Sequence, residues 1–289
     1  IIGTYYSHYV PPPIHRHQND VIGLDDLTGK KRWQFSHSGT FFSAASFSND
    51  LAFLSTNIVD LLAIDWQKGQ IKWEKQLGGA PWAAPAIYED YVIVSSSDGY
   101  VYGLRQLDGN LAWKIYCGGS AGSNLTVVGK YAFVAVNGPV DQKRMLVLNL
   151  SSRKIISEFS TNTQSWSPLV ISDAGLVFFF DRTTLYSYDV KKSTLAWKFS
   201  PPPSLLPYPV LMKDTIILGM NSMGRHGEHA SKLILLDRQQ GVVRLNSEVG
   251  GIGTRFTKLI QDGNNVIVVD YSIRAYQLDI STESRNARQ

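Results

Sequence analysis

Hydrophobic residues along this chain come in short runs that end at turn-forming residues. In one segment the apolar runs, rich in β-branched and aromatic side chains, cover residues 84–89, 91–96, 100–105 and 111–116. Between them lie Asp90, Ser97-Asp98-Gly99 and Asp108-Gly109, which favour tight turns. The runs do not keep the 3.6-residue period of an amphipathic helix. The pattern therefore predicts four antiparallel strands in this segment.

This four-strand unit repeats along the chain. The turn before its last strand reads Leu24-Asp25-Asp26-Leu27-Thr28-Gly29 in the first copy, and Trp33 follows. We call the apolar residue that opens this turn the anchor; the anchors are Leu24, Ile64, Leu104, Leu148, Tyr188, Leu236 and Leu278. Four strands repeated at spacings of 40 to 48 residues are typical of propeller blades. We therefore predict an all-β fold, a β-propeller of four-stranded antiparallel blades.

Length and repeat number define the expected domain organisation. Residues 1–289 are expected to form a single propeller domain with seven blades, and an eighth if the chain is a fragment. Ile1 to Tyr6 aligns with the second strand of a blade, and the last repeat reaches Gln289 without a matching tryptophan. Upstream residues would supply the missing outer and inner strands and so remove exposed edges. We therefore expect a fragment or a trimmed chain.

Four tryptophans stand nine residues after their anchors, and they are Trp33, Trp73, Trp113 and Trp197. A ring at a fixed offset from a glycine turn can lie flat on the neighbouring blade and bury roughly 150–250 Å². We expect these four side chains to be structural and to dock one blade on the next. Ser157 and Leu245 stand at the same place in the fourth and sixth repeats, so those junctions should be less tightly docked.

The pattern apolar-Asp-x-x-Thr-Gly-x-x-x-Trp resembles the PQQ-like repeat family. The resemblance covers nearly the whole chain and is clearest in the first three repeats, anchored at Leu24, Ile64 and Leu104. Members include quinoprotein dehydrogenases and BamB-type outer-membrane assembly scaffolds, so the resemblance implies the fold more strongly than the function. It also implies an extracytoplasmic location, periplasmic or luminal.

Charge and cysteine content restrict the kinds of binding partner and of catalytic chemistry that we expect. The 28 Lys and Arg and 24 Asp and Glu residues give a net charge of +4 without a basic stripe, so no nucleic acid partner is expected. The chain lacks an apolar run of the roughly 18 residues that a membrane span needs. Membrane contact is therefore expected only through a partner or a missing segment. Cys117 is the single cysteine, so the vicinal cysteine pair implied by a quinoprotein dehydrogenase is excluded.

Motifs for catalysis are not recognisable in the sequence. Gly-x-Ser-x-Gly, His-Glu-x-x-His and phosphate-loop patterns do not occur. The aspartates that follow the anchors are expected to cap turns. We therefore expect no enzymatic activity and no cofactor. Two histidine-containing loops are weak candidates for a metal site and are more simply explained as solvated loops; they contain His15, His17, His226 and His229.

One face of the predicted propeller is more elaborate than the other. The loops between second and third strands share this face with the links between blades, and the longest loops belong to the first, fourth and sixth repeats. Large apolar side chains with some Tyr and Arg stand on the links, around the mouth of the central channel. They have the character of an interaction hot spot, although packing of inner strands would also explain them. The candidate partner-binding residues are Phe42, Trp82, Trp166, Tyr208, Arg255 and Phe256.

These features support three functional hypotheses. The first is a non-enzymatic scaffold that binds a protein partner on the elaborate face. The second is a ligand-sensing or luminal domain of a larger membrane protein. The third is a degenerate quinoprotein dehydrogenase. The sequence leaves the partner and the oligomeric state open.

Overall fold

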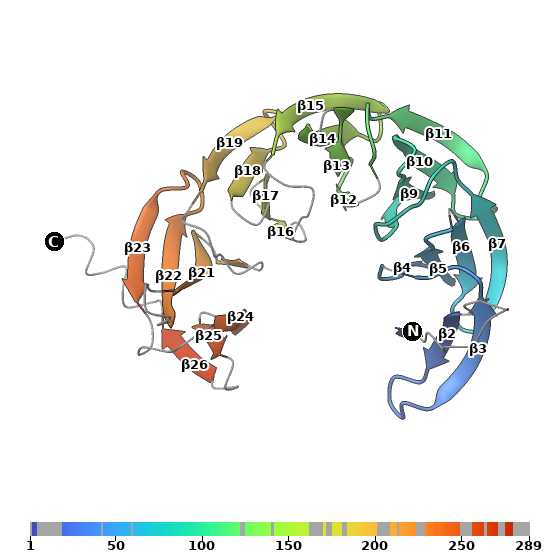
Figure 1. Ribbon diagram of the computed structural model, residues 1–289, viewed down its shortest axis with the longest axis horizontal. Helices are drawn as coiled ribbons and strands as arrows, with labels where there is room; N and C mark the ends of the chain where they lie inside the picture. The colour runs from blue at the N-terminus through green and yellow to red at the C-terminus, as the bar shows by residue number, and fades with distance from the viewer. Residues whose placement is uncertain are drawn as a thin grey trace. The chain divides into compact units, whose positions relative to one another are not determined.

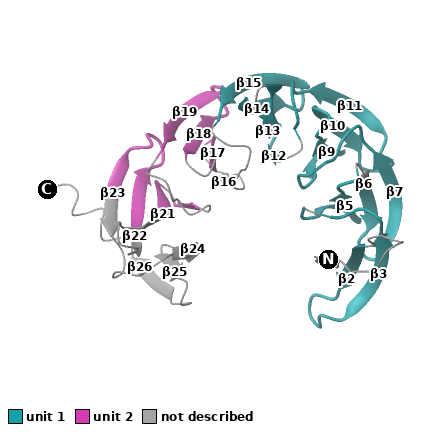
Figure 2. Cartoon of the chain, in the orientation of Figure 1, with its two compact units in different colours: residues 1–164 teal, residues 165–289 magenta. Residues whose placement is uncertain are grey.

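The computed structural model describes the strands and turns of most repeats. The described residues are 2–4, 19–41, 43–58, 60–121, 125–139, 142–161, 170–171, 175–180, 184–200, 209–212, 214–223, 229–248, 256–262, 265–270 and 275–279. The chain divides into two compact units, residues 1–164 and residues 165–289 (Figure 2). Each unit is described by itself, and the single domain over residues 1–289 stays a prediction.

The described part of residues 1–164 forms four antiparallel sheets (Figure 1). The first sheet contains β1 (Ile2–Thr4), β2 (Asn19–Leu24) and β3 (Lys31–His37). The second contains β4 (Ser46–Ser48), β5 (Leu51–Ser55), β6 (Asp60–Asp65) and β7 (Gln70–Gln76). The third contains β8 (Ala86–Tyr88), β9 (Tyr91–Ser95), β10 (Tyr100–Arg105) and β11 (Leu111–Tyr116). The fourth contains β12 (Leu125–Val128), β13 (Tyr131–Asn137), β14 (Lys143–Asn149) and β15 (Lys154–Ser160).

The described part of residues 165–289 forms three more sheets of the same kind. The first contains β16 (Val170–Ile171), β17 (Leu176–Phe180), β18 (Leu185–Asp189) and β19 (Thr194–Phe199). The next contains β20 (Val210–Leu211), β21 (Thr215–Met223), β22 (His229–Asp237) and β23 (Val243–Glu248). The last contains β24 (Phe256–Asp262), β25 (Asn265–Asp270) and β26 (Ala275–Asp279).

Strands that are neighbours in sequence are neighbours in every one of these sheets. This up-and-down order in repeated antiparallel sheets is that of β-propeller blades. The predicted all-β fold with four-stranded antiparallel blades is therefore confirmed. We number the sheets in chain order as blades one to seven. The total of seven blades, or eight, stays a prediction for the protein as a whole.

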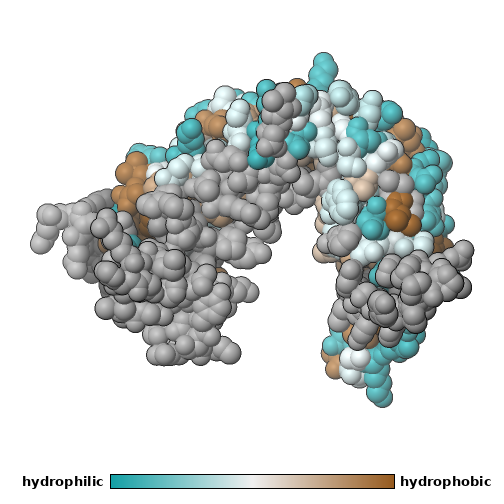
Figure 3. Space-filling model, in the orientation of Figure 1, coloured by the Kyte–Doolittle hydropathy of each residue, from teal (hydrophilic) through white to brown (hydrophobic). Residues whose placement is uncertain are grey.

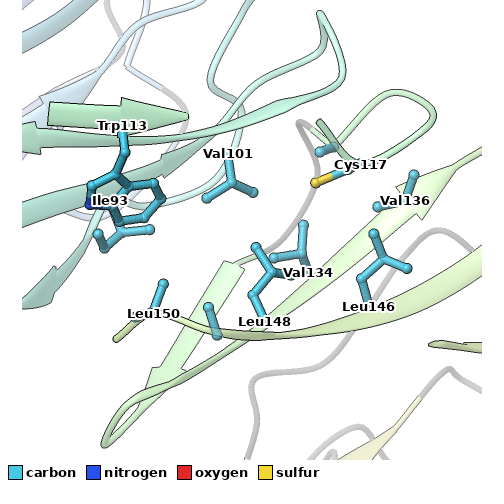
Figure 4. Packing of buried hydrophobic residues seen from close by; sticks show 11 residues of the cluster. Ile93, Val101, Trp113, Cys117, Val134, Val136, Leu146, Leu148 and Leu150 are labelled. Carbon is cyan, nitrogen blue, oxygen red and sulfur yellow. The ribbon is translucent and has the colours of Figure 1, made fainter. Parts of the chain in front are cut away.

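The core lies between the faces of neighbouring blades. Middle strands such as β9 and β13 are continuous buried runs, as expected for strands covered on both faces. Outer strands such as β7 and β11 alternate or are exposed. Figure 4 shows the cluster between blades three and four, where Ile93, Val101 and Trp113 face Leu146, Leu148 and Leu150. Burial of apolar surface between blades supplies the main stabilising term.

The turn between the third and fourth strands is built in the same way in the described blades. In five of them the residue directly after the anchor is Asp or Asn. Its Oδ1 accepts N–H groups from the residues two or three positions later. Asp65 Oδ1, for example, accepts from Gln67 N at 3.2 Å and Lys68 N at 3.1 Å. The residue five positions after the anchor has a left-handed backbone, with φ between 55° and 69°. In the six blades it is Gly29, Gly69, Gly109, Arg153, Ser193 and Gly241. The aspartates thus serve as turn caps, as the sequence predicts.

Three repeat tryptophans donate their indole N–H groups to this turn in the next blade. The distances are 3.0 Å from Trp33 Nε1 to Trp66 O, 2.8 Å from Trp73 Nε1 to Gln106 O, and 3.3 Å from Trp197 Nε1 to Arg238 O. Trp113 is buried in the cluster between blades three and four, together with Leu150. Each donating indole therefore links two blades through a backbone carbonyl.

The residue whose carbonyl accepts the indole N–H forms a second hydrogen bond through its own backbone N–H. Its N–H donates to a carbonyl in the turn between the first and second strands of its own blade. The distances are 3.3 Å from Trp66 N to Asp50 O, 3.0 Å from Gln106 N to Asp90 O, and 3.1 Å from Arg238 N to Asp214 O. Both backbone groups of this residue are thus used, one within the blade and one between blades. We call the end of the blades formed by these two kinds of turn the turn face.

The docked rings leave no room for side chains beside them. A Cβ on Gly69 would lie 2.4 Å from the Trp33 ring, and a Cβ on Gly241 would lie 2.5 Å from the Trp197 ring. Ser193 replaces glycine in blade five, and Ser157 of blade four stands where four of the repeats have tryptophan. Glycine thus stands where the rings of Trp33, Trp73 and Trp197 dock, whereas Arg153 occupies this position in blade four.

A second size constraint acts inside each blade. The residues opposite Trp33, Trp73, Trp113 and Trp197 on the neighbouring strand are Gly23, Ala63, Gly103 and Ser187. The residues opposite Ser157 and Leu245 are the larger Val147 and Leu235. The Trp33 indole lies across its own hairpin: a Cβ on Gly23, on the neighbouring strand, would be only 2.2 Å from the ring. Small cross-strand partners therefore accompany the tryptophans.

A pair of glycine substitutions separates backbone strain from docking. Gly29 and Gly69 have nearly the same φ, 67° and 69°, but a Cβ on Gly29 has nothing within 4 Å. We expect Gly29→Ala to cost about 1–2 kcal/mol because of the left-handed backbone. Gly69→Ala should cost about 1–3 kcal/mol more, because the new methyl group displaces Trp33. Urea unfolding of the two variants measures the difference, and equal losses would show that the ring is not packed on this turn.

The turn aspartates predict how stability depends on pH. In Asp25 and Asp189 the hydrogen bond from the backbone N–H three residues later lowers the pKa below 3.8. In Asp65 and Asp237 partial burial raises the pKa, but hydrogen bonds from the turn and from a basic side chain outweigh it, so the pKa is also lowered. Because the pKa is lower in the folded state, this stabilisation is present above about pH 4 and is lost as the pH falls.

A variant with asparagine at all four aspartates tests this dependence. Asn149 already occupies the same place in blade four and accepts the Ser152 N–H at 3.0 Å. We expect the variant D25N/D65N/D189N/D237N to lose less stability than the wild type between pH 4 and pH 2. Urea midpoints across this range measure the slope. Identical slopes in the two proteins would mean that the aspartates do not carry the acid sensitivity.

Candidate functional site

The face opposite the turn face is formed by the links between blades and by the turns between second and third strands, and we call it the link face. In the described residues each link is held on such a turn in the blade that it enters. Thr40 O accepts Asn57 N at 3.0 Å, Ala80 O accepts Ser97 N at 3.0 Å, and Ser120 O accepts Asn137 N at 2.9 Å. These contacts recur with the repeat and fix the links in place.

Trp82 lies on one of these fixed links, between β7 and β8. Two residues earlier, Ala80 forms a second hydrogen bond, in which its N–H donates to Ser97 Oγ at 2.8 Å. The neighbours Pro81 and Ala83 are buried, whereas the Trp82 side chain is 47% exposed. A large aromatic group is therefore presented on a rigid segment, which lowers the entropy cost of binding.

Further aromatic side chains lie next to the turn on which this link is held. Tyr100, the first residue of β10, has its ring 5.2 Å from that of Tyr116, which is 61% exposed. Lys114 Nζ lies 4.3 Å from the centre of the Tyr100 ring. The Tyr102 hydroxyl donates to Asp98, and burial together with this carboxylate raises the pKa of Tyr102 to about 12. These groups form an amphipathic surface suited to contacts with another protein.

Most of the other predicted partner-binding residues lie outside the described residues. This is so for Phe42, Trp166, Tyr208 and Arg255. Phe256 opens β24, where the backbone pairs with that of Asp270, and its side chain is outside the description. Trp82 is therefore the one predicted contact residue whose exposure is established.

Most of the histidines predicted as weak metal ligands also lie outside the described residues. His15, His17 and His226 lie outside the described residues, and His229 is described only as the first backbone position of β22. Within the described part of the chain, no group of three His, Cys, Asp or Glu side chains is arranged to hold a metal ion. Burial raises the pKa of the Cys117 thiol to about 12, so this side chain is a core residue and not a reactive thiol.

The turn face carries a pocket that the sequence reasoning missed. It lies between blades one and two and has a volume of about 530 Å³. Its lining residues are Gly23, Leu24, Asp26, Arg32, Trp33, Phe47, Asn49 and Trp66. The sequence signal was that Phe47 and Trp66 are aromatic where the next repeat has Ile87 and Gln106. Neighbouring side chains from two blades define the pocket, so a single repeat does not reveal it.

The surface of residues 1–164 that faces the viewer in Figure 3 is mostly hydrophilic, and hydrophobic residues appear on it as separate spots. The described residues visible on this side therefore form no broad apolar area. In the part of the chain that the structure describes, no helix is long and apolar enough to cross a membrane.

The blades, the tryptophan docking and the turn geometry together define a β-propeller. A family model described as outer membrane protein assembly factor BamB matches residues 17–151 of this chain. The match confirms the resemblance to PQQ-like, BamB-type propellers that the sequence motif indicates.

Two solved structures show the same fold. The crystal structure of BamB from Moraxella catarrhalis has a TM-score of 0.63 at 14% sequence identity, and the match covers 90% of this chain and 82% of that one. The computationally designed Ika8 protein has a TM-score of 0.65 at 12% identity, over 88% of this chain and 75% of that one. At these identities the likeness concerns the fold. Comparison with curated protein sequences gives no match.

Proposed function

We propose that this protein is a non-enzymatic scaffold that binds a protein partner through its link face. The observation that carries the proposal is Trp82, which is 47% exposed on a link held by the hydrogen bonds between Ala80 and Ser97. Rigid, partly exposed aromatic side chains are typical of the residues that dominate binding energy in interfaces.

The repeat supports a wider aromatic site on this face. Phe42, Trp82 and Trp166 each stand 18 residues after an anchor, namely Leu24, Ile64 and Leu148. In a propeller, equivalent links of successive blades surround the same channel mouth. Tyr208, Arg255 and Phe256 stand on later links, and we propose each of the six residues as a partner contact.

The ionisable groups of the described residues favour a scaffold over an enzyme. The aspartates after the anchors are used as turn caps and have lowered pKa values. General acids and bases need pKa values near the working pH instead. Cys117 is shielded in the core. These groups support a structural role, and we infer that the protein works without a cofactor.

The matched family model supports a proposal for compartment and partner class. Its description names an outer membrane protein assembly factor. We therefore place this protein outside the cytoplasm, in a periplasmic or luminal space, with another protein as its partner.

Site-specific photocrosslinking tests the binding face directly. A p-benzoylphenylalanine at position 82 should crosslink to one defined protein in cells of the source organism. The matched control position is Leu107, which is 86% exposed on the turn face of blade three, and the same crosslink should be absent there. Trp82→Ala should weaken capture of that protein about thirtyfold or more if Trp82 is a hot spot, whereas Leu107→Ala should leave it unchanged.

Two results would contradict the proposal. One is a crosslink of equal yield from positions 82 and 107. The other is unchanged capture by a folded Trp82→Ala variant, which would place the binding surface elsewhere. A quinone that co-purifies with the protein would instead support the dehydrogenase hypothesis.

A further inference from the structure

The pocket on the turn face has aromatic walls that come from two blades. Trp33 belongs to β3 of blade one, and Phe47 and Trp66 belong to blade two. Phe47 and Trp66 meet edge to face, with an angle of 82° between the rings and 6.4 Å between their centres. Phe47 is 51% exposed. The pocket is therefore a corner of perpendicular rings that is open to solvent.

The polar groups of the pocket favour a positively charged ligand. Arg32 is already paired, since its Nε and Nη2 lie 3.1 Å and 2.7 Å from Asp25 Oδ2. Asp26 is exposed at the rim. Among the described residues, no hydrogen bond or ion pair to the Asp26 carboxylate is found. The Arg32–Asp25 pair is neutral, so the lining has one uncompensated charge, which is negative.

The corresponding place at the next blade junction lacks this chemistry. Ile87 and Gln106 stand where the first junction has Phe47 and Trp66. The hydrogen bond that shapes the turn is nevertheless kept. Trp66 Nε1 donates to Asn49 O at 3.0 Å, and Gln106 Nε2 donates to Glu89 O at 2.7 Å. The aromatic corner is therefore not needed to build the turn.

We propose that this pocket binds an arginine side chain presented by another protein. Guanidinium groups stack on Trp and other aromatic faces, and they form paired hydrogen bonds with a carboxylate. The rings of Phe47 and Trp66 supply the faces, and Asp26 supplies the carboxylate. This site lies at the opposite end of the blades from Trp82, so it is a second binding site and does not depend on the proposed function.

The test uses Nα-acetyl-L-arginine methylamide as the probe. Its neutral counterpart, Nα-acetyl-L-citrulline methylamide, has nearly the same shape and keeps most of the hydrogen-bond donors. Titration followed by the indole N–H signals of the tryptophans should give saturable shifts at Trp66 and Trp33, with a dissociation constant on the order of 1 mM. The citrulline compound should bind at least about fivefold more weakly.

Two variants locate the binding. F47I/W66Q gives the first junction the residues of the second, and its glutamine can keep the hydrogen bond to Asn49 O that Trp66 makes. Trp33 then reports binding, and the affinity should fall about tenfold. Asp26→Asn should weaken binding about threefold to fivefold. Asp90→Asn, at an exposed turn position of blade three, should have no effect.

Several results would overturn the proposal. They are equal binding of the arginine and citrulline compounds, absence of shifts at Trp66 and Trp33, and unchanged affinity in F47I/W66Q or Asp26→Asn. Shifts confined to Trp82 would assign the probe to the link face instead.

Discussion

The docking of an indole ring on the turn of the next blade is the interaction on which the rest of this structure depends. The ring lies against a glycine in the left-handed region, and its N–H binds a carbonyl whose residue is also held by the first turn of its own blade. Among the described residues, no backbone hydrogen bond joins a strand of one sheet to a strand of another, and the indole links the sheets instead. Trp73 also packs against an apolar cluster that contains Phe53 of its own blade and Val92 and Leu104 of the next blade. One side chain thus couples two blades by burial and by a hydrogen bond.

The turn face and the link face therefore have different roles in the structure. The turn face carries the docking contacts, so most of its sequence is constrained by glycine, aspartate and the ring itself. The link face is fixed by backbone contacts such as that between Ala80 and Ser97, which leave the neighbouring side chains free to vary. Trp82 illustrates this freedom, and the pocket beside Trp33 shows that the turn face can also gain a surface where extra aromatic residues are added.

The sequence predicts the strands well because hairpins depend on neighbouring residues. Residues 91–96, 100–105 and 111–116 correspond closely to β9, β10 and β11. The first strand was predicted too long, over 84–89, whereas β8 covers Ala86–Tyr88; Pro85 just before it has no N–H to donate to the ladder. The repeat also predicts the turn caps, because each Asp binds N–H groups only two or three residues away.

Features that depend on two blades were harder to predict. Trp66 reads as an ordinary turn residue until Phe47 and Trp33 are seen beside it. The matching of small residues to docked rings, as in Gly23 and Trp33, requires knowledge of the strand register. The predicted aromatic site on the link face combines residues from several blades, and Trp82 is the one among them whose side chain the structure describes. Local patterns predict that successive repeats are neighbours, but they do not show which side chains of two neighbouring blades meet.

Hydrogen exchange of a Trp73→Ser variant tests the central role of docking most directly. Serine is the residue that blade four carries at this place, at Ser157. The account predicts a loss of about 3–5 kcal/mol in stability. It also predicts faster exchange at Gln106 and Gly109, which lie in the turn of blade three that receives the ring. Faster exchange confined to β6 and β7, with unchanged protection of residues 105–110, would contradict the claim that the tryptophan couples the two blades.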